Sequence, residues 1–184
     1  STGKELPLRL SGESDAVCGT RMLELNRASQ EFCFEDIEHP PVPSLLRGLS
    51  APVKLYYDYS DEALMFLMAH DPDGFNRWDA AQGLLQSILR ARVADPASGL
   101  PRGFIDAFRN ALTDRDSDRA LLAEVLTLPS ESYLGDLMEQ VDVEGIHRAR
   151  EGLKLELATA LKEVFMAIYA ENEVVGEYQP APAD

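Results

Sequence analysis

The pattern of apolar and polar residues changes its period near residue 60. Before that point, residues 4–10 and 30–37 alternate with period two, which is typical of a half-buried β-strand. Residues 22–25 and the aromatic-rich residues 53–59 predict two more short strands. Four short strands with a bare edge do not make a self-sufficient sandwich. We therefore expect residues 1–59 to be the closing part of a larger β-sandwich.

From Ser60 onward the apolar residues follow the helical period. Ser60 is an expected N-cap, because Asp61 and Glu62 follow it in the first turn, where the helix dipole favours negative charge. The pattern predicts a first helix that ends near His70, and Ser130 is expected to cap a later one. The further helices are predicted at residues 75–94, 102–113, 117–128, 131–140 and 143–173.

The apolar faces of these helices are broad, and the breaks between them are short. In the second helix the expected core face comprises Phe75, Trp78, Ala81, Leu85, Ile88 and Leu89. In the last helix it comprises Leu153, Leu157, Ala160, Leu161, Val164, Phe165 and Ile168. This pattern favours stacked antiparallel helices, as in an α-solenoid, over a coiled coil. Residues 60–184 are thus predicted to be the first part of a helical domain, and the whole chain to be mostly α with a small β part.

Between the two halves lies a segment with prolines at positions 40, 41 and 43. Proline lacks the backbone donor and restricts φ, so neither a strand nor a helix can continue through it. Leu45, Leu46 and Leu49 follow, and we expect their side chains to be buried in a seam between the two halves.

Composition and charge exclude several classes of protein. The chain has 184 residues, of which 45% are hydrophobic, and a formal net charge of −15, distributed as −3 over residues 1–59 and −12 over residues 60–184. An acidic surface repels phosphate backbones, so nucleic acid is not an expected partner. No apolar run reaches the roughly 20 residues that span a bilayer, and no signal-peptide core is present, so a cytoplasmic location is predicted.

The sequence offers few candidates for chemistry. Two cysteines, Cys18 and Cys33, are expected to be free, buried thiols, with a cross-strand bridge as the alternative. His39 and His70 are expected to be exposed or to meet helix-terminal carbonyls. Trp78 is expected to anchor the core.

The nearest approach to a metal motif is formed by Glu144, His147 and Glu151 on the last predicted helix. Two-metal sites in helical bundles use such a Glu-x-x-His spacing twice, with further carboxylates from other helices. Here one copy occurs beside Arg148, Arg150 and Lys154, so ion pairing is the favoured interpretation. The sequence has no His-Glu-x-x-His and no Gly-x-Ser-x-Gly motif. We therefore predict no catalytic, cofactor-binding or metal-binding residue in this chain.

Four segments together resemble one family. They are Gln30-Glu31-Phe32-Cys33-Phe34, the stretch from Pro41 to Leu55, Phe75-Asn76-Arg77-Trp78-Asp79-Ala80-Ala81-Gln82, and Leu126-Thr127-Leu128-Pro129-Ser130. In this order they are similar to segments of bacterial aminopeptidase N enzymes. These are zinc metallo-aminopeptidases that trim N-terminal residues from peptides. The resemblance extends from about Lys4 to Tyr169 and covers the end of an immunoglobulin-like β-sandwich and the start of the helical domain.

The resemblance implies a role without chemistry of its own. The zinc-binding His-Glu-x-x-His helix and the Gly-x-Met-Glu-Asn segment of such enzymes are absent from this sequence. The resemblance therefore implies an inactive piece of a longer, zinc-dependent peptidase. A sequence that starts without methionine favours the same interpretation. Its expected partners are the parent's catalytic domain and, for the parent, peptide substrates, with self-association through cut faces. The alternative is a free-standing helical module that docks a basic partner on its acidic face.

Overall fold

The structure, a computed structural model, describes residues 3–173, which divide between Val53 and Lys54 into two compact units. The β unit comprises residues 3–53 and the helical unit residues 54–173.

The β unit contains little regular structure. Strand β1 (Arg9–Leu10) pairs antiparallel with β2 (Phe34–Glu35), and an isolated bridge joins Leu8 to Val17. The strands expected over residues 4–10 and 30–37 are therefore present only as these short pairings. The expected strands over residues 22–25 and 53–59 are wrong, since neither segment has a partner strand within residues 3–173. A period-two pattern marks residues that suit a strand, but only a second strand beside them supplies the hydrogen bonds.

The proline segment leads into a short 3₁₀-helix, η1 (Arg47–Leu49). Leu46 and Leu49 adopt left-handed backbone conformations, with φ of 54° and 53°, and flank Gly48 at φ 63°. Leu45 and Leu46 are half-buried, whereas Leu49 is 66% exposed. The expectation that Leu49 is buried is therefore wrong, because the tight turn directs this residue to solvent.

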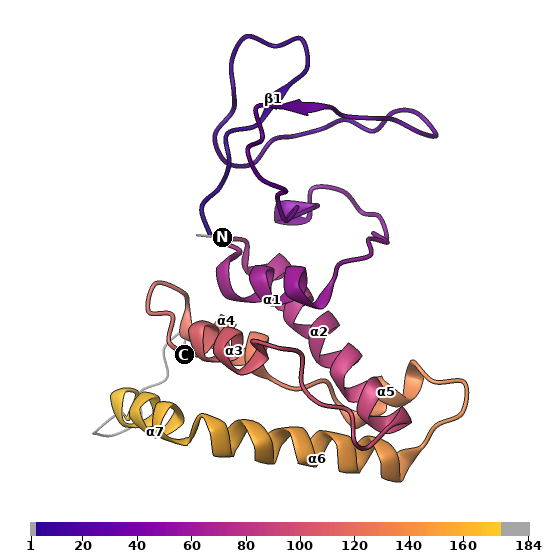
Figure 1. Cartoon of the computed structure of the whole chain (residues 1–184), viewed down its shortest axis with the longest axis vertical. Helices are drawn as coiled ribbons and strands as arrows, with labels where there is room; N and C mark the ends of the chain where they lie inside the picture. The colour runs from indigo at the N-terminus through magenta and orange to yellow at the C-terminus, as the bar shows by residue number, and fades with distance from the viewer. Residues whose placement is uncertain (1–2, 174–184) are drawn as a thin grey trace. The chain divides into compact units, whose positions relative to one another are not determined.

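Seven helices form the described part of the helical unit (Figure 1). They are α1 (Asp61–His70), α2 (Gly74–Ala94), α3 (Phe104–Leu112), α4 (Arg119–Leu126), α5 (Glu131–Asp136), α6 (Val143–Ala160) and α7 (Lys162–Glu171). The chain is mostly α with a small β part, as the sequence predicts. No helix among the described residues combines the length and the apolar run that a bilayer crossing requires.

Five of the helices begin at a side-chain cap. The Ser60 hydroxyl accepts a hydrogen bond from the Ala63 amide at 3.3 Å, and Ser130 does the same for Tyr133 at 3.2 Å. Both caps were predicted from the sequence. Aspartates cap the other three helices, namely Asp73, Asp118 and Asp142. Each cap satisfies an amide that has no partner inside its helix.

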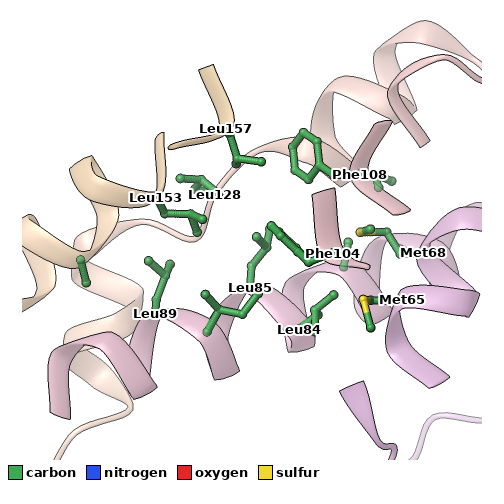
Figure 2. Close-up of a cluster of buried hydrophobic side chains, with 14 of the residues drawn as sticks. Met65, Met68, Leu84, Leu85, Leu89, Phe104, Phe108, Leu128, Leu153 and Leu157 are labelled. Atoms are coloured by element: carbon green, nitrogen blue, oxygen red, sulfur yellow. The ribbon is translucent and has the colours of Figure 1, made fainter. Parts of the chain in front are cut away.

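Helix α2 is the centre of this unit and packs against α1, α4 and α6. Its core face includes Leu84, Leu85 and Leu89, which are fully buried. Figure 2 shows side chains from other helices, and Leu128 from the connection after α4, around this face: Met65, Met68, Phe104, Phe108, Leu128, Leu153 and Leu157. Phe75, however, is 47% exposed, because it lies in the first turn of α2, and Trp78 is half-buried at the edge of the core.

The single long helix expected over residues 143–173 is two helices. Leu161 leaves the helical conformation, with φ −116° and ψ 14°, and separates α6 from α7. Its side chain is 1% exposed, so it still belongs to the core with Leu153 and Leu157. Around the break the expected stripe fails: Ala160, just before it, is exposed, and after it Phe165 is 37% exposed and Val164 and Ile168 are only half-buried.

Candidate functional site

The most elaborate polar cluster surrounds Arg77, a residue of α2 that is 4% exposed. Its Nε donates to the Met68 carbonyl at 2.8 Å, at the C-terminal end of α1. Its Nη1 donates to Asp114 Oδ2 at 2.7 Å and to Ser117 Oγ at 2.6 Å, in the connection between α3 and α4. One guanidinium thereby joins three parts of the helical unit.

The partners of Arg77 are themselves bonded. The Ser117 hydroxyl donates to Asp114 Oδ2 at 2.7 Å, and the Asp116 amide donates to Oδ1 at 3.0 Å. Partial burial by itself would raise the pKa of Asp114, but the bonds from Ser117 and Arg77 outweigh it and lower the pKa to about 2. The polar groups of this cluster bond to one another, so the cluster serves to hold the end of α1, helix α2 and the connection between α3 and α4 together.

Arg77 was not among the predicted site residues, although the sequence contains a signal for it. The residue lies four positions before Ala81 and eight before Leu85, on the apolar face of α2. An arginine on a buried face requires acceptors for its five N–H groups. That requirement predicts a hydrogen-bonded cluster, but the partners come from a segment nearly 40 residues away.

His147 and Glu151 of the Glu144, His147 and Glu151 constellation have different partners. His147 Nδ1 lies 2.9 Å from Glu131 Oε1, at the start of α5. Lys154 Nζ donates to Glu151 Oε1 at 2.8 Å, and this bond is the main cause that lowers the pKa of Glu151. The ion pairing expected from the sequence is thus present. Within residues 3–173, no three His, Cys, Asp or Glu side chains are grouped so that they could hold a metal ion.

The other histidines and the cysteines lie apart from these clusters. His70 ends α1, its ring centroid 5.0 Å from that of Phe66, and His39 is exposed. Cys18 and Cys33 are free, but both are exposed, so the expectation of burial is wrong. The β unit has no buried apolar core that could cover them.

The register of the strands also explains why the cysteines are not bridged. Val17 bonds to Leu8 on one side of β1, and the Cys33 carbonyl accepts from the Ser11 amide on the other side. Cys18 therefore lies opposite residue 7 and Cys33 opposite residue 11. Four strand positions correspond to about 13 Å, which exceeds the limit of about 7 Å between the Cα atoms of a disulfide.

One open groove of about 880 Å³ follows the exposed side of α2 and the connection between α5 and α6. Its lining is mixed in charge and includes Gln86, Arg90, Met138, Glu139 and Asp142. None of the lining residues is a histidine or a cysteine, and Asp142 Oδ1 accepts from the Gly145 amide at 2.8 Å as the cap of α6. The groove has room for a ligand, and its charged lining residues are Arg90, Glu139 and Asp142.

Comparison with known proteins accounts for both units. A family described as a domain of unknown function (DUF3458_C) with ARM repeats matches residues 61–184, and one described as a domain of unknown function (DUF3458) with an Ig-like fold matches residues 2–58. The chain is 42% identical over 174 residues to aminopeptidase N of Escherichia coli, which covers 92% of this chain and 20% of that protein. This chain belongs to the aminopeptidase N family.

Further aminopeptidase N relatives agree with this assignment. The Caulobacter vibrioides protein is 32% identical over 92% of this chain and 20% of its own length. Among solved structures, aminopeptidase A of Legionella pneumophila, in complex with aspartic acid, superposes with a TM-score of 0.72 at 28% identity over 96% of this chain and 21% of that one. This chain thus spans about one fifth of the length of these relatives and corresponds to a C-terminal-side part of them.

The zinc ion implied by the family does not fit the residues present here. The three histidines of the chain lie in separate segments, and His147 already pairs with Glu131. No cluster of three ligating side chains forms among the described residues.

Proposed function

We propose that this chain is a non-catalytic part of an aminopeptidase N-type zinc metallopeptidase, which forms the scaffold beside the active site and covers it. The supporting observation is the extent of the family match: nearly all of this chain aligns, but with only a fifth of the relative. The remaining four fifths of the relative leave ample sequence for a zinc site and catalytic groups. In this proposal the parent is a cytoplasmic peptide hydrolase, and its catalytic domain is the partner of this chain.

The structure of the helical unit suits such a role. Helices α1 to α6 share one continuous apolar core, and the Arg77 cluster ties the end of α1 to α2 and to the connection between α3 and α4. Densely packed helices of this kind hold their shape and transmit displacement, which a covering element requires. In the same proposal the chain by itself binds no zinc and cleaves no peptide.

The first test is an aminopeptidase assay on the purified 184-residue chain. Fluorogenic alanyl- and lysyl-amides are offered with and without added zinc, beside the full-length E. coli aminopeptidase N as the positive control. We expect turnover by the full-length enzyme alone and no stoichiometric zinc in the dialysed chain. Chelator-sensitive turnover by the chain itself would overturn the proposal, and E144Q, H147Q and E151Q would then be the first variants to make.

A second test addresses the scaffold role directly. R77M is introduced at the position of Arg77 in the full-length parent, and R109M serves as the matched control because Arg109 lies on the surface of α3. We expect R77M to lower kcat/KM while the zinc content stays unchanged, because the covering region is loosened and the zinc ligands lie elsewhere. Full activity of R77M, with the helical unit shown to be loosened, would count against a scaffold role.

A further inference from the structure

A second pocket, of about 290 Å³, lies between α7 and the segment that connects α3 to α4. We call it the α7 pocket. Its lining includes Arg115 and Arg119 from the α3–α4 segment, and Glu163, Ala167 and Glu171 from α7. It shares no lining residue with the groove along α2. Two arginines and two glutamates therefore enclose one small space from opposite sides.

Only half of these charges pair with each other. Glu163, Ala167 and Glu171 recur every four residues, so they share one face of α7. Arg115 Nη2 lies 2.6 Å from Glu171 Oε1. Within residues 3–173, no ion pair joins Arg119 or Glu163 to another side chain. The short side chain of Ala167, between the two glutamates, leaves the space beside this open pair of charges unfilled.

The lining suits a small ligand that carries charges of both signs. The glutamates repel a simple anion and the arginines repel a simple cation, whereas a zwitterion interacts favourably with Arg119 and Glu163 at once. A guanidinium also binds a carboxylate through two parallel hydrogen bonds.

The remaining lining sets the size and the polarity of the ligand. Val164 and Ile168 are half-buried in α7 and offer an apolar surface next to the charges. The volume is close to the lower limit of the roughly 300–1,000 Å³ that is typical of small-molecule sites. The pocket therefore fits a single amino acid better than a peptide.

We propose that the α7 pocket binds a free amino acid with an apolar side chain. Its α-carboxylate pairs with Arg119, its α-ammonium group pairs with Glu163, and its side chain lies on Val164 and Ile168. The ligand thereby bridges α4 and α7 and stabilises a helix of which no residue is buried. That free amino acids are the products of the parent enzyme rests on the proposed function, and on that basis the pocket is a product-binding site away from the zinc.

The test is an NMR titration of the full 184-residue chain, labelled with ¹⁵N, with L-leucine. We expect saturable shifts in the millimolar range, because an open pocket screens its charges, and we expect them at the amides of residues 113–119 and 163–171. N-acetyl-leucine lacks the ammonium group and leucinamide lacks the carboxylate. Each should bind at least about tenfold more weakly than leucine, because one charged partner is then lost.

Variants of the chain test the same two contacts from the protein side. R119Q and E163Q should each weaken leucine binding at least about tenfold. R109Q and E144Q are the matched controls, because both residues lie outside the pocket, and they should leave binding unchanged. A167F, which fills the pocket, should abolish binding. Far-UV circular dichroism verifies that each variant retains its helices.

Several results would overturn the proposal. They are the absence of saturable shifts, shifts at amides outside the two segments alone, equal binding of N-acetyl-leucine or leucinamide, and unchanged binding by R119Q or E163Q. The titration involves no peptide cleavage, so none of these results bears on the proposed function. Turnover by the chain, which would overturn the proposed function, would in turn leave a positive titration in force.

Discussion

Different interactions stabilise each of the two units of this chain. Every buried hydrophobic residue among the described positions belongs to the helical unit, from Met65 to Leu161. In the β unit the long-range contacts are polar: Arg9 pairs with Glu35 and Asp36, and Arg21 and Arg47 pair with glutamates. Apolar burial is the dominant favourable term in folding, whereas exposed ion pairs contribute little.

The contrast shows why one unit has a regular fold and the other has mostly extended chain. Helices satisfy their own backbone groups and need only one apolar face to pack. Short strands need neighbours on both sides and a second sheet to cover them. The β unit, which matches an Ig-like family, has β1 and β2 but no second sheet within residues 3–53.

The largest expected effect comes from removing core volume in the helical unit. L153A should lower its free energy of unfolding by about 3–5 kcal/mol, because Leu153 is fully buried between α6 and α2. L155A, two residues away on the outward side, should change it by less than about 0.5 kcal/mol. Urea unfolding followed by fluorescence of Trp78, the one tryptophan, measures both at a concentration that keeps the chain monomeric. Equal effects would contradict the assignment of the two faces.

The second largest loss of stability is expected when the Arg77 cluster is disrupted. R77M should destabilise the helical unit by about 3 kcal/mol, since it leaves the Met68 carbonyl without its donor and removes the guanidinium that pairs with Asp114. R109M, which removes an exposed pair with Asp106, should cost less than about 0.5 kcal/mol in the same urea assay. A value for R77M as small as that of R109M would mean that the cluster does not pin the helices.

Low pH should also reduce the stability that the Arg77 cluster contributes. The pKa of Asp114 is about 2 in the folded chain against an ordinary value of 3.8, so its contribution is complete above about pH 5 and is lost as the pH falls toward 2. We expect about 2 kcal/mol less stability at pH 2 from this group. The loss should be smaller in R77M, because that variant no longer holds the pKa of Asp114 down. Identical acid titrations of the two chains would refute this linkage.

The smallest effects are expected in the β unit. R9Q should change its local opening free energy by about 1 kcal/mol or less, because the partners Glu35 and Asp36 are partly exposed to solvent. Amide hydrogen exchange at Leu8, Ser11 and Val17 measures this, and we expect these amides to exchange far faster than those of Leu85 and Leu89 in α2. Raising the salt concentration should speed exchange in the β unit alone. Protection in the β unit equal to that of α2 would contradict the comparison.

Local chemistry alone predicted much of the helical unit. The caps at Ser60 and Ser130 and the buried positions Leu85, Leu89 and Leu153 follow from residue type and spacing within a few turns. The ion pair between Glu151 and Lys154 follows in the same way. The resemblance to aminopeptidase N likewise rests on short segments of the sequence. The comparisons confirm the family.

Other features required the tertiary structure. No glycine or proline marks the break at Leu161, and the exposure of Phe165 follows from where α7 lies after that break. The side-chain partners of Arg77 lie about 40 residues away, and the partner strand of β1 about 25, so no local pattern predicts them. The sequence by itself therefore determined where helices start, which faces turn inward and to which family the chain belongs. Strand pairing and the Arg77 cluster were decided by contacts between distant segments, because their energy exists only once those segments meet.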